Sequence, residues 1–185
     1  MAREVEIKFL VADAKALARR LRTAGFRLVT RRTHEMNVLY DVAGHLLRQR
    51  GEILRLRKYG DRWTFTHKSK GTERRHKSRQ EIETEVADGP SLDRILRAVG
   101  FSPAFRYEKF RTEWSDGHGH VVIDETPIGT VAEIEGRPRW IDRTAKLLGI
   151  PPTSYITLSY GAMFEEWRRR TASSAREMTF AAVRS

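Results

Sequence analysis

Charged side chains recur in pairs, two residues apart, in segments of this 185-residue chain that alternate between polar and apolar residues. Side chains two residues apart in a β-strand share one face, so apolar residues would cover the opposite face. The pairs and the single charges near them are Glu4 and Glu6 with Lys8, Arg55 and Arg57, Lys68, Glu81 and Glu83, Lys109 and Arg111, Asp124, and Glu133 and Glu135. Same-sign neighbours destabilise a sheet, so their recurrence in five segments indicates that the charged face has a function.

These residue types fit two kinds of charged ligand. Carboxylate oxygens hold hard divalent cations, whereas Lys and Arg bind phosphate oxygens, Arg in bidentate fashion. A polyphosphate with its metal ions satisfies both sets at once. For one pair alone, such as Glu4 and Glu6, a solvated strand face with sodium from solvent is the simpler interpretation. The case for a site therefore depends on the recurrence.

The elements that must position these residues follow from the same patterns. Alternation predicts strands over residues 3–9, 26–40, 52–59, 62–70, 79–86, 101–114, 120–125 and 130–136. Apolar residues at helical spacing predict helices over 13–25, 91–100, 139–148 and 160–170. We expect Asp13 to be the N-cap of the first helix and Gly25 to end it, and we expect Ser91 to be the N-cap of the second helix.

The other segments carry weaker signals. Residues 44–51 predict a short helical turn or loop, and the polar, basic segment 71–78 predicts a mobile loop. The tail after Trp167 is either helical or frayed. No linker or repeat divides the chain, so we expect one domain over residues 1–185, with a core of about 3–160 and a helical segment over 160–185.

Strands with one apolar and one charged face, together with these helices, predict an α+β fold with two possible architectures. An open sheet could expose its charged face to water. Alternatively, the strands could close into a barrel with charges in the lumen and helices outside. Closure removes sheet edges, and a wide lumen can hold a polar ligand.

Composition restricts the class of protein. The chain is 39% hydrophobic and 32% charged, which is typical of a folded protein. Its net charge of +11, from 35 basic and 24 acidic residues, favours polyanionic partners such as nucleic acid, polyphosphates or nucleotides. The lack of cysteine excludes disulfides and thiol–zinc sites and agrees with a cytoplasmic protein. We see no signal peptide, and no apolar run approaches the roughly 20 residues of a membrane span.

The Glu4-x-Glu6-x-Lys8 motif resembles the signature of the CYTH superfamily, the triphosphate tunnel metalloenzymes. This superfamily contains class IV adenylate cyclases, thiamine triphosphatases and inorganic triphosphatases. The resemblance extends in order through LRLRK, FTHK, RQEIETE, EKFRTEW, VIDE and AEIEG, over roughly residues 3–160. A single ExExK motif is weak, but the ordered set is specific.

The resemblance implies a closed, antiparallel eight-stranded barrel whose lumen holds a triphosphate with Mg²⁺ or Mn²⁺. The implied metal ligands are Glu4, Glu6, Glu81, Glu83, Asp124, Glu133 and Glu135. The implied triphosphate-binding residues are Lys8, Arg55, Arg57, Lys68, Lys109 and Arg111, and these form the catalytic set together with Glu4 and Glu6.

Three functions remain open. The first is metal-dependent hydrolysis of a small triphosphate, namely inorganic tripolyphosphate, thiamine triphosphate or a nucleoside triphosphate. The second is a class IV-type cyclase that makes cyclic AMP and pyrophosphate from ATP. The third is a non-catalytic binder of polyphosphate or RNA, using the lumen or the basic cluster Arg74, Arg75, His76, Lys77 and Arg79.

Nucleic acid is the less favoured partner, because no aromatic residues are interleaved with that basic cluster. His118 and His120 flank a glycine in a turn, and we interpret them as exposed residues rather than half of a metal site. We expect Tyr155 and Tyr160 to pack near the tunnel mouth. The physiological triphosphate, the choice of metal and the oligomeric state, monomer or homodimer, stay undetermined.

Overall fold

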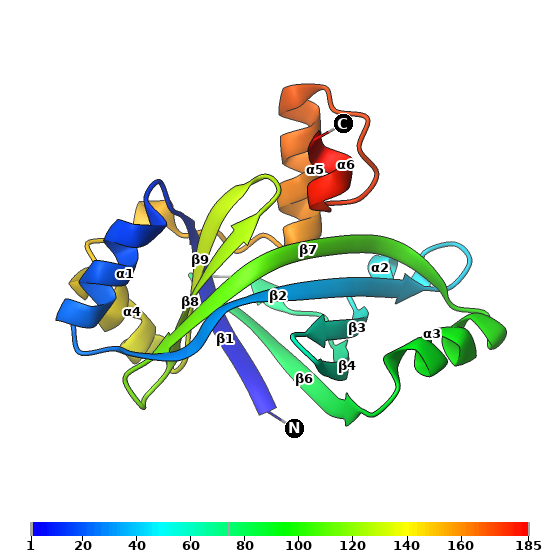
Figure 1. The fold of residues 1–185 in the computed structure, drawn as a ribbon, viewed down its shortest axis with the longest axis horizontal. Coiled ribbons are helices and arrows are strands. Elements are labelled where there is room, and N and C mark those ends of the chain that lie inside the picture. Colours follow the sequence, from blue (N-terminus) through cyan, green and yellow to red (C-terminus); the bar gives the residue numbers. More distant parts are fainter. Residues whose placement is uncertain (1, 74, 185) are drawn as a thin grey trace.

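The computed structural model describes residues 2–73 and 75–184, in which eight strands close into an antiparallel β-barrel. They pair in the order β1-β9-β8-β7-β2-β3-β4-β6, and β6 pairs with β1 to close the ring (Figure 1). The strands are β1 (Ala2–Leu10), β2 (Arg27–Asp41), β3 (Ile53–Tyr59), β4 (Arg62–Lys68), β6 (Lys77–Val86), β7 (Ser102–Ser115), β8 (His120–Thr126) and β9 (Gly129–Glu135). The expected α+β fold with a closed barrel is confirmed, and the open-sheet alternative is wrong.

The register of the strands places the paired charges on one side of this wall. Glu6 pairs with Glu135 and Lys8 with Glu133 between β1 and β9. Arg111 pairs with Asp124 between β7 and β8. Because side chains alternate along each strand, every charge pair of the sequence then points to the same side, the lumen.

Helices cover the outside of the barrel. Figure 1 shows α1 and α4 together at one end, α3 at the opposite end, and α5 and α6 above β7. The helices are α1 (Ala14–Thr23), α2 (Leu46–Arg50), α3 (Gly89–Ala98), α4 (Pro138–Leu147), α5 (Tyr160–Thr171) and α6 (Phe180–Arg184), with a 3₁₀ turn, η1, at Pro152–Ser154. Within the described ranges, no helix combines the length and the apolar composition needed to cross a bilayer.

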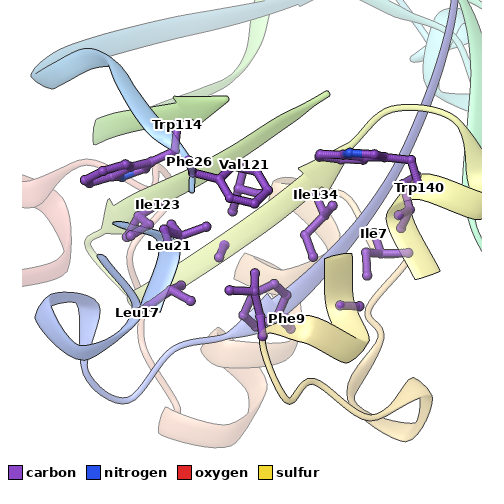
Figure 2. Packing of buried hydrophobic residues seen from close by; sticks show 14 residues of the cluster. Ile7, Phe9, Leu17, Leu21, Phe26, Trp114, Val121, Ile123, Ile134 and Trp140 are labelled. Carbon is purple, nitrogen blue, oxygen red and sulfur yellow. The ribbon is translucent and has the colours of Figure 1, made fainter. Parts of the chain in front are cut away.

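The main apolar core lies between the outer face of β1, β8 and β9 and the helices α1 and α4. Figure 2 shows Ile7 and Phe9 of β1 and Ile134 of β9 meeting Leu21 of α1 and Trp140 of α4. Burying each such large side chain contributes roughly 1.5–3 kcal/mol, so this cluster provides a large share of the folding free energy. Asp13 caps α1 as expected, because its side chain accepts a hydrogen bond from the Ala16 amide.

Two smaller clusters support the rest of the barrel. One joins Tyr107 of β7 to Tyr160, Met163 and Phe164 of α5 and to Met178 of the tail. The other contains only three buried residues among those described, Tyr40 of β2, Leu56 of β3 and Leu96 of α3. The wall formed by β3, β4 and β6 is thus covered more thinly than the wall formed by β1, β8 and β9.

The segment 71–78 differs from the prediction of a mobile loop. Thr72 and Glu73 form a short strand, β5, that pairs with Ser78 and Lys77 at the start of β6. The prediction was wrong because it took basic composition as a sign of mobility, although the alternation of β6 continues back to Lys77. Arg74 lies outside the described residues.

The start of α3 also differs from the prediction. Asp88, not Ser91, is the N-cap, and its side chain accepts a hydrogen bond from the Ser91 amide. The helix begins at Gly89 with a proline next, which a first helical turn tolerates. A Cβ at Gly89 would lie 2.2 Å from the Trp63 ring, so glycine permits α3 to start directly against β4.

The C-terminal tail is attached to the barrel. The Met178 amide donates to the Arg106 carbonyl, and the Glu108 amide donates to the Met178 carbonyl. The Met178 side chain is fully buried, and the Phe180 ring contacts Phe110 of β7. The tail therefore covers the edge of β7 before the stretch where β8 pairs with it.

Candidate functional site: a charged lumen

A cavity of about 1110 Å³ runs inside the barrel, and twelve of the thirteen candidate residues line it. These are Glu4, Glu6, Lys8, Arg55, Arg57, Lys68, Glu81, Glu83, Lys109, Arg111, Glu133 and Glu135. Asp124 points to the same side of the wall but is 0% exposed, because Lys109, Arg111 and Tyr160 cover it. The structure thus brings residues from seven strands, far apart in sequence, to one site.

Asp124 holds the basic pair of β7. It accepts hydrogen bonds from Lys109 Nζ at 2.8 Å and from Arg111 Nε and Nη2 at 2.8 and 2.6 Å. The Tyr160 hydroxyl donates to the same carboxylate at 2.6 Å. With three residues donating to it in a buried position, Asp124 fixes the directions in which Lys109 and Arg111 point.

Glu133 connects that group to β1. Its carboxylate lies 2.6 Å from Arg111 Nη2 and 3.1 Å from Lys8 Nζ, and Lys8 also pairs with Glu6. Burial alone would raise the pKa of Glu133, but Lys8 and Arg111 outweigh it and hold that pKa well below its usual range. Burial opposes the charge on Lys8 too, yet Glu133 and Glu6 raise the pKa of Lys8. Both groups are therefore ionised.

The opposite wall contains a second network. Lys68 Nζ lies 2.7 Å from Glu4 and 3.1 Å from Glu81. Arg57 Nη2 donates to both carboxylate oxygens of Glu83 at 3.1 and 3.0 Å, and Arg55 Nη2 lies 3.5 Å from the same group. The cations of these two networks are therefore already paired, and an incoming polyanion would exchange carboxylate contacts for its own oxygens.

Carboxylates and cations occur in similar numbers along the lumen, so its overall charge is close to neutral. The chain's excess of 35 basic over 24 acidic residues therefore lies mostly outside the tunnel. What distinguishes the lumen is the placement of its charges rather than a net positive charge.

The carboxylates of β1 and β9 provide oxygen ligands, which are the type that a hard divalent cation binds. Glu135 has no ion-pair partner among the described residues, and it faces Glu6 across the strand pair. It has access to the water of the lumen, yet the surrounding walls desolvate it, and this burial together with Glu4, Glu133 and Glu6 raises the pKa of Glu135 to about 7. A cation would relieve that repulsion, although no His, Asp or Glu cluster in the described ranges forms a complete metal site.

Sequence reasoning missed several lumen residues. Glu35 and Asn37 of β2 are buried beside the basic pairs, and their spacing continues the alternation of that long strand. Lys77 lines the cavity as well, and extending the predicted strand 79–86 backward by two residues would have found it. Arg79, the first residue of that predicted strand, also lines the cavity. Of the proposed basic cluster, Arg75 and His76 instead contact Asp142 outside the lumen. The four described members of this cluster therefore do not form one exposed patch.

One end of the cavity carries apolar and aromatic side chains in addition to charged ones. Leu39, Ile53 and Phe105 occupy its last lumen-facing positions. The Phe105 ring lies 5.7 Å from Tyr107, and Tyr107 lies 5.6 Å from Tyr160, each pair nearly parallel. Tyr160 lines the cavity and its hydroxyl donates to the buried Asp124, whereas Tyr155 packs against the main outer core and does not line the cavity. His120, which we considered as part of a metal site, contacts Glu113 and does not line the cavity.

A search of family models matches residues 2–138 of the chain to the CYTH domain. A candidate adenylate cyclase of Methanocaldococcus jannaschii is 25% identical over 146 residues, which cover 78% of this chain and 83% of that protein.

Solved structures share the fold. A candidate adenylate cyclase of Vibrio parahaemolyticus superposes with a TM-score of 0.78 at 20% identity, covering 88% of this chain and 97% of that one. A Hippeastrum protein, described as a candidate adenylyl cyclase with a dominant triphosphatase activity, has a TM-score of 0.64 at 21% identity, covering 88% of this chain and 95% of that one.

Proposed function

The chain belongs to the CYTH family, and on that premise we propose that it binds a small triphosphate in the barrel lumen and hydrolyses it with a divalent cation. The observation that carries this proposal is the convergence of twelve charged candidates of both signs on one enclosed cavity. Lys and Arg on facing walls provide contacts for phosphate oxygens, while carboxylates between them provide ligands for a cation.

Binding exchanges one set of ion pairs for another. Arg55, Arg57 and Lys68 leave the carboxylates of β6 and β1 for phosphate oxygens, which is possible because these partners retain some solvent access. Lys109 and Arg111 keep Asp124 behind them while their remaining N–H groups turn to the ligand. The triphosphate is then oriented along the lumen from both walls.

Glu4, Glu6 and Glu135 are the residues we assign to the divalent cation, with Glu133 beside them. Mg²⁺ or Mn²⁺ bound there would offset negative charge on the phosphates as the reaction proceeds. The protein contributes Lys8, Lys109 and Arg111, which stabilise the charge that develops on the phosphoryl oxygens. In the hydrolysis, a water oxygen bonds to the terminal phosphorus, the bridging P–O bond breaks, and orthophosphate and a diphosphate are released.

Cyclisation of a nucleoside triphosphate is a second candidate. There the ribose 3′-hydroxyl would bond to the α-phosphorus and pyrophosphate would leave. The apolar and aromatic side chains at one end of the cavity, Leu39, Ile53 and Phe105, favour a triphosphate that carries an organic group, as ATP and thiamine triphosphate do. We favour hydrolysis because it requires fewer specialised residues.

The test is a panel of tripolyphosphate, ATP and thiamine triphosphate, each with Mg²⁺ or Mn²⁺, in which orthophosphate, pyrophosphate and cyclic AMP are measured separately. Orthophosphate release identifies a triphosphatase, whereas cyclic AMP with pyrophosphate identifies a cyclase. Glu6→Gln abolishes metal-dependent turnover on the proposed assignment. Glu125→Gln, on the outer face of β8, is the matched control. Unchanged turnover in Glu6→Gln would refute the assignment.

Binding without turnover would support the non-catalytic alternative. RNA binding would show a steep salt dependence and no need for Mg²⁺. Tripolyphosphate binding with a strict cation requirement would instead agree with a lumen site.

A further inference from the structure

Glu35 is a carboxylate in the middle of β2 that is 0% exposed. Its strand lies between the two basic pairs of the lumen, because β2 pairs with β7 on one side and β3 on the other. Glu35 is the cross-strand neighbour of Lys109, and Asn37 is the neighbour of Arg57. A charge with no solvent access needs compensation from its surroundings.

The compensation comes from the catalytic cations. Glu35 Oε1 lies 3.4 Å from Lys109 Nζ, and Oε2 lies 3.8 Å from Arg111 Nε. Asn37 Nδ2 donates to Oε1 at 2.9 Å, while Oε2 accepts no hydrogen bond from the described residues. Although burial favours the neutral acid, Lys109 and Arg111 hold the pKa of Glu35 far below its usual range.

Glu35 does not itself bind the substrate. It has no exposed surface, and its charge would repel phosphate oxygens. It also does not line the cavity, unlike Lys109 and Arg111. Any effect of Glu35 on a reaction in the lumen must therefore pass through the neighbouring cations, mainly Lys109 and Arg111 and less strongly Arg57 and Arg55.

We propose that Glu35, held by Asn37, is a positioning residue that restrains Lys109 and Arg111 from behind and limits the positive charge they present to a bound triphosphate. This inference rests on the function proposed above. Asp124 supports the same two side chains from β8, so the pair is held between two buried carboxylates on either side of β7. Such restraint favours contacts that become strong only in the transition state, rather than tighter binding of the ground state.

The consequence is a split between rate and affinity. Glu35→Gln keeps the shape of the side chain and its acceptor for Asn37 but removes the negative charge. We expect kcat to fall about 10- to 100-fold, the range seen when a group behind a site residue is removed. The Kd for tripolyphosphate stays the same or decreases, because the lumen becomes more positive. If Glu35 had only a structural role, the folded variant would keep the wild-type kcat and the wild-type Kd.

The matched control is Asp116→Asn. Asp116 is a carboxylate outside the cavity, and it accepts hydrogen bonds from Trp140 Nε1 and from the His118 amide. We expect this variant to unfold at lower urea concentration with kcat retained. Asn37→Ala removes one hydrogen bond to Glu35 and leaves its charge in place, so we expect a smaller decrease in kcat. This variant is the test if Glu35→Gln does not fold.

The measurements are kcat and KM on the best substrate of the panel, calorimetric Kd for tripolyphosphate, and urea unfolding for each variant. Reduced kcat with unchanged or tighter binding in Glu35→Gln or Asn37→Ala supports the inference. Wild-type kcat, or a weaker Kd with kcat unchanged, overturns it while the proposed function stands. Wild-type protein that turns over no triphosphate overturns the proposed function, and the positioning role with it.

Discussion

The two basic pairs of the lumen have the same spacing but different support. Lys109 and Arg111 on β7 contact Asp124 and Glu35, both fully buried. Arg55 and Arg57 on β3 contact Glu83, whose side chain is 33% exposed. One pair is held before any ligand arrives, whereas the other can adjust to it.

The outer faces of the two barrel walls also differ in how densely they are packed. The wall of β1, β8 and β9, which supplies Glu133 and Asp124, is covered by the main core under α1 and α4. The wall of β3, β4 and β6 is covered by a cluster with few fully buried residues, under α3. This barrel therefore combines a rigid wall and an adaptable wall around one cavity. The packing density on the outer face of each wall determines how firmly the charged side chains on its inner face are held.

The largest expected effect is on stability, and it compares matched leucines in the two covering helices. Leu21 of α1 is completely buried in the main core, and Leu96 of α3 lies in the small cluster. Leu21→Ala destabilises the protein by about 4 kcal/mol, whereas Leu96→Ala costs about 2 kcal/mol because its thinner surroundings can collapse or admit water. Urea unfolding measures both, and equal losses would break the comparison.

The next effect is on turnover. Arg111→Lys lowers kcat/KM about 100-fold, because an ammonium cannot reproduce the forked contacts of Arg111 with Asp124 and Glu133. Arg57→Lys lowers it only about fivefold, since its neighbours are partly exposed and can move toward the shorter reach of lysine. Steady-state kinetics on the same substrate decide between these values. A larger loss in Arg57→Lys would contradict the view that the basic pair of β7 is held more firmly than the basic pair of β3.

A smaller effect concerns local opening. Saturating tripolyphosphate with Mg²⁺ slows amide exchange about tenfold in β3, β4 and β6, whose opening the ligand suppresses by bridging Arg55, Arg57 and Lys68 to the other wall. Amides of β1, β8 and β9 change less, because that wall is already held by the main core. Hydrogen exchange followed by mass spectrometry, with sulfate as the control anion, tests this. Uniform protection of both walls would falsify it.

Sequence reasoning located the charged strand faces because alternation is a direct consequence of strand geometry. Alternation alone left an open sheet and a barrel both possible, and the family resemblance implied the closed barrel. The ordered motifs from Glu4 to Glu135 located strands that the fold then brought together. It missed Glu35, since an isolated acid in THEMNVLY carries no pair signal, and only closure of β2 between β3 and β7 reveals its neighbours. It also missed the start of β6, because a basic segment was taken for a loop.

The unequal support of the two walls was not accessible from the sequence either. Leu96 and Leu21 have similar helical spacing and similar neighbours along the chain. Their difference depends on how many other elements reach each cluster. Residues of both α1 and α4 join the main core, whereas α3 is the only described helix that contributes residues to the small cluster. Such tertiary contacts have no local signature.

The smallest effects should come from exposed ion pairs. They compare the two walls at positions where neither pair is buried. Arg32 of β2 lies 2.8 Å from Glu125 of β8, and Arg62 of β4 lies 3.8 Å from Glu85 of β6. Arg62→Ala changes the unfolding free energy by less than about 0.5 kcal/mol, and Arg32→Ala by about 0.5–1 kcal/mol, since Arg32 also lies over the Phe110 ring. Urea unfolding at low and high salt measures both changes. If either exposed pair proved worth as much as Leu96, then surface charge rather than packing would set the difference between the walls.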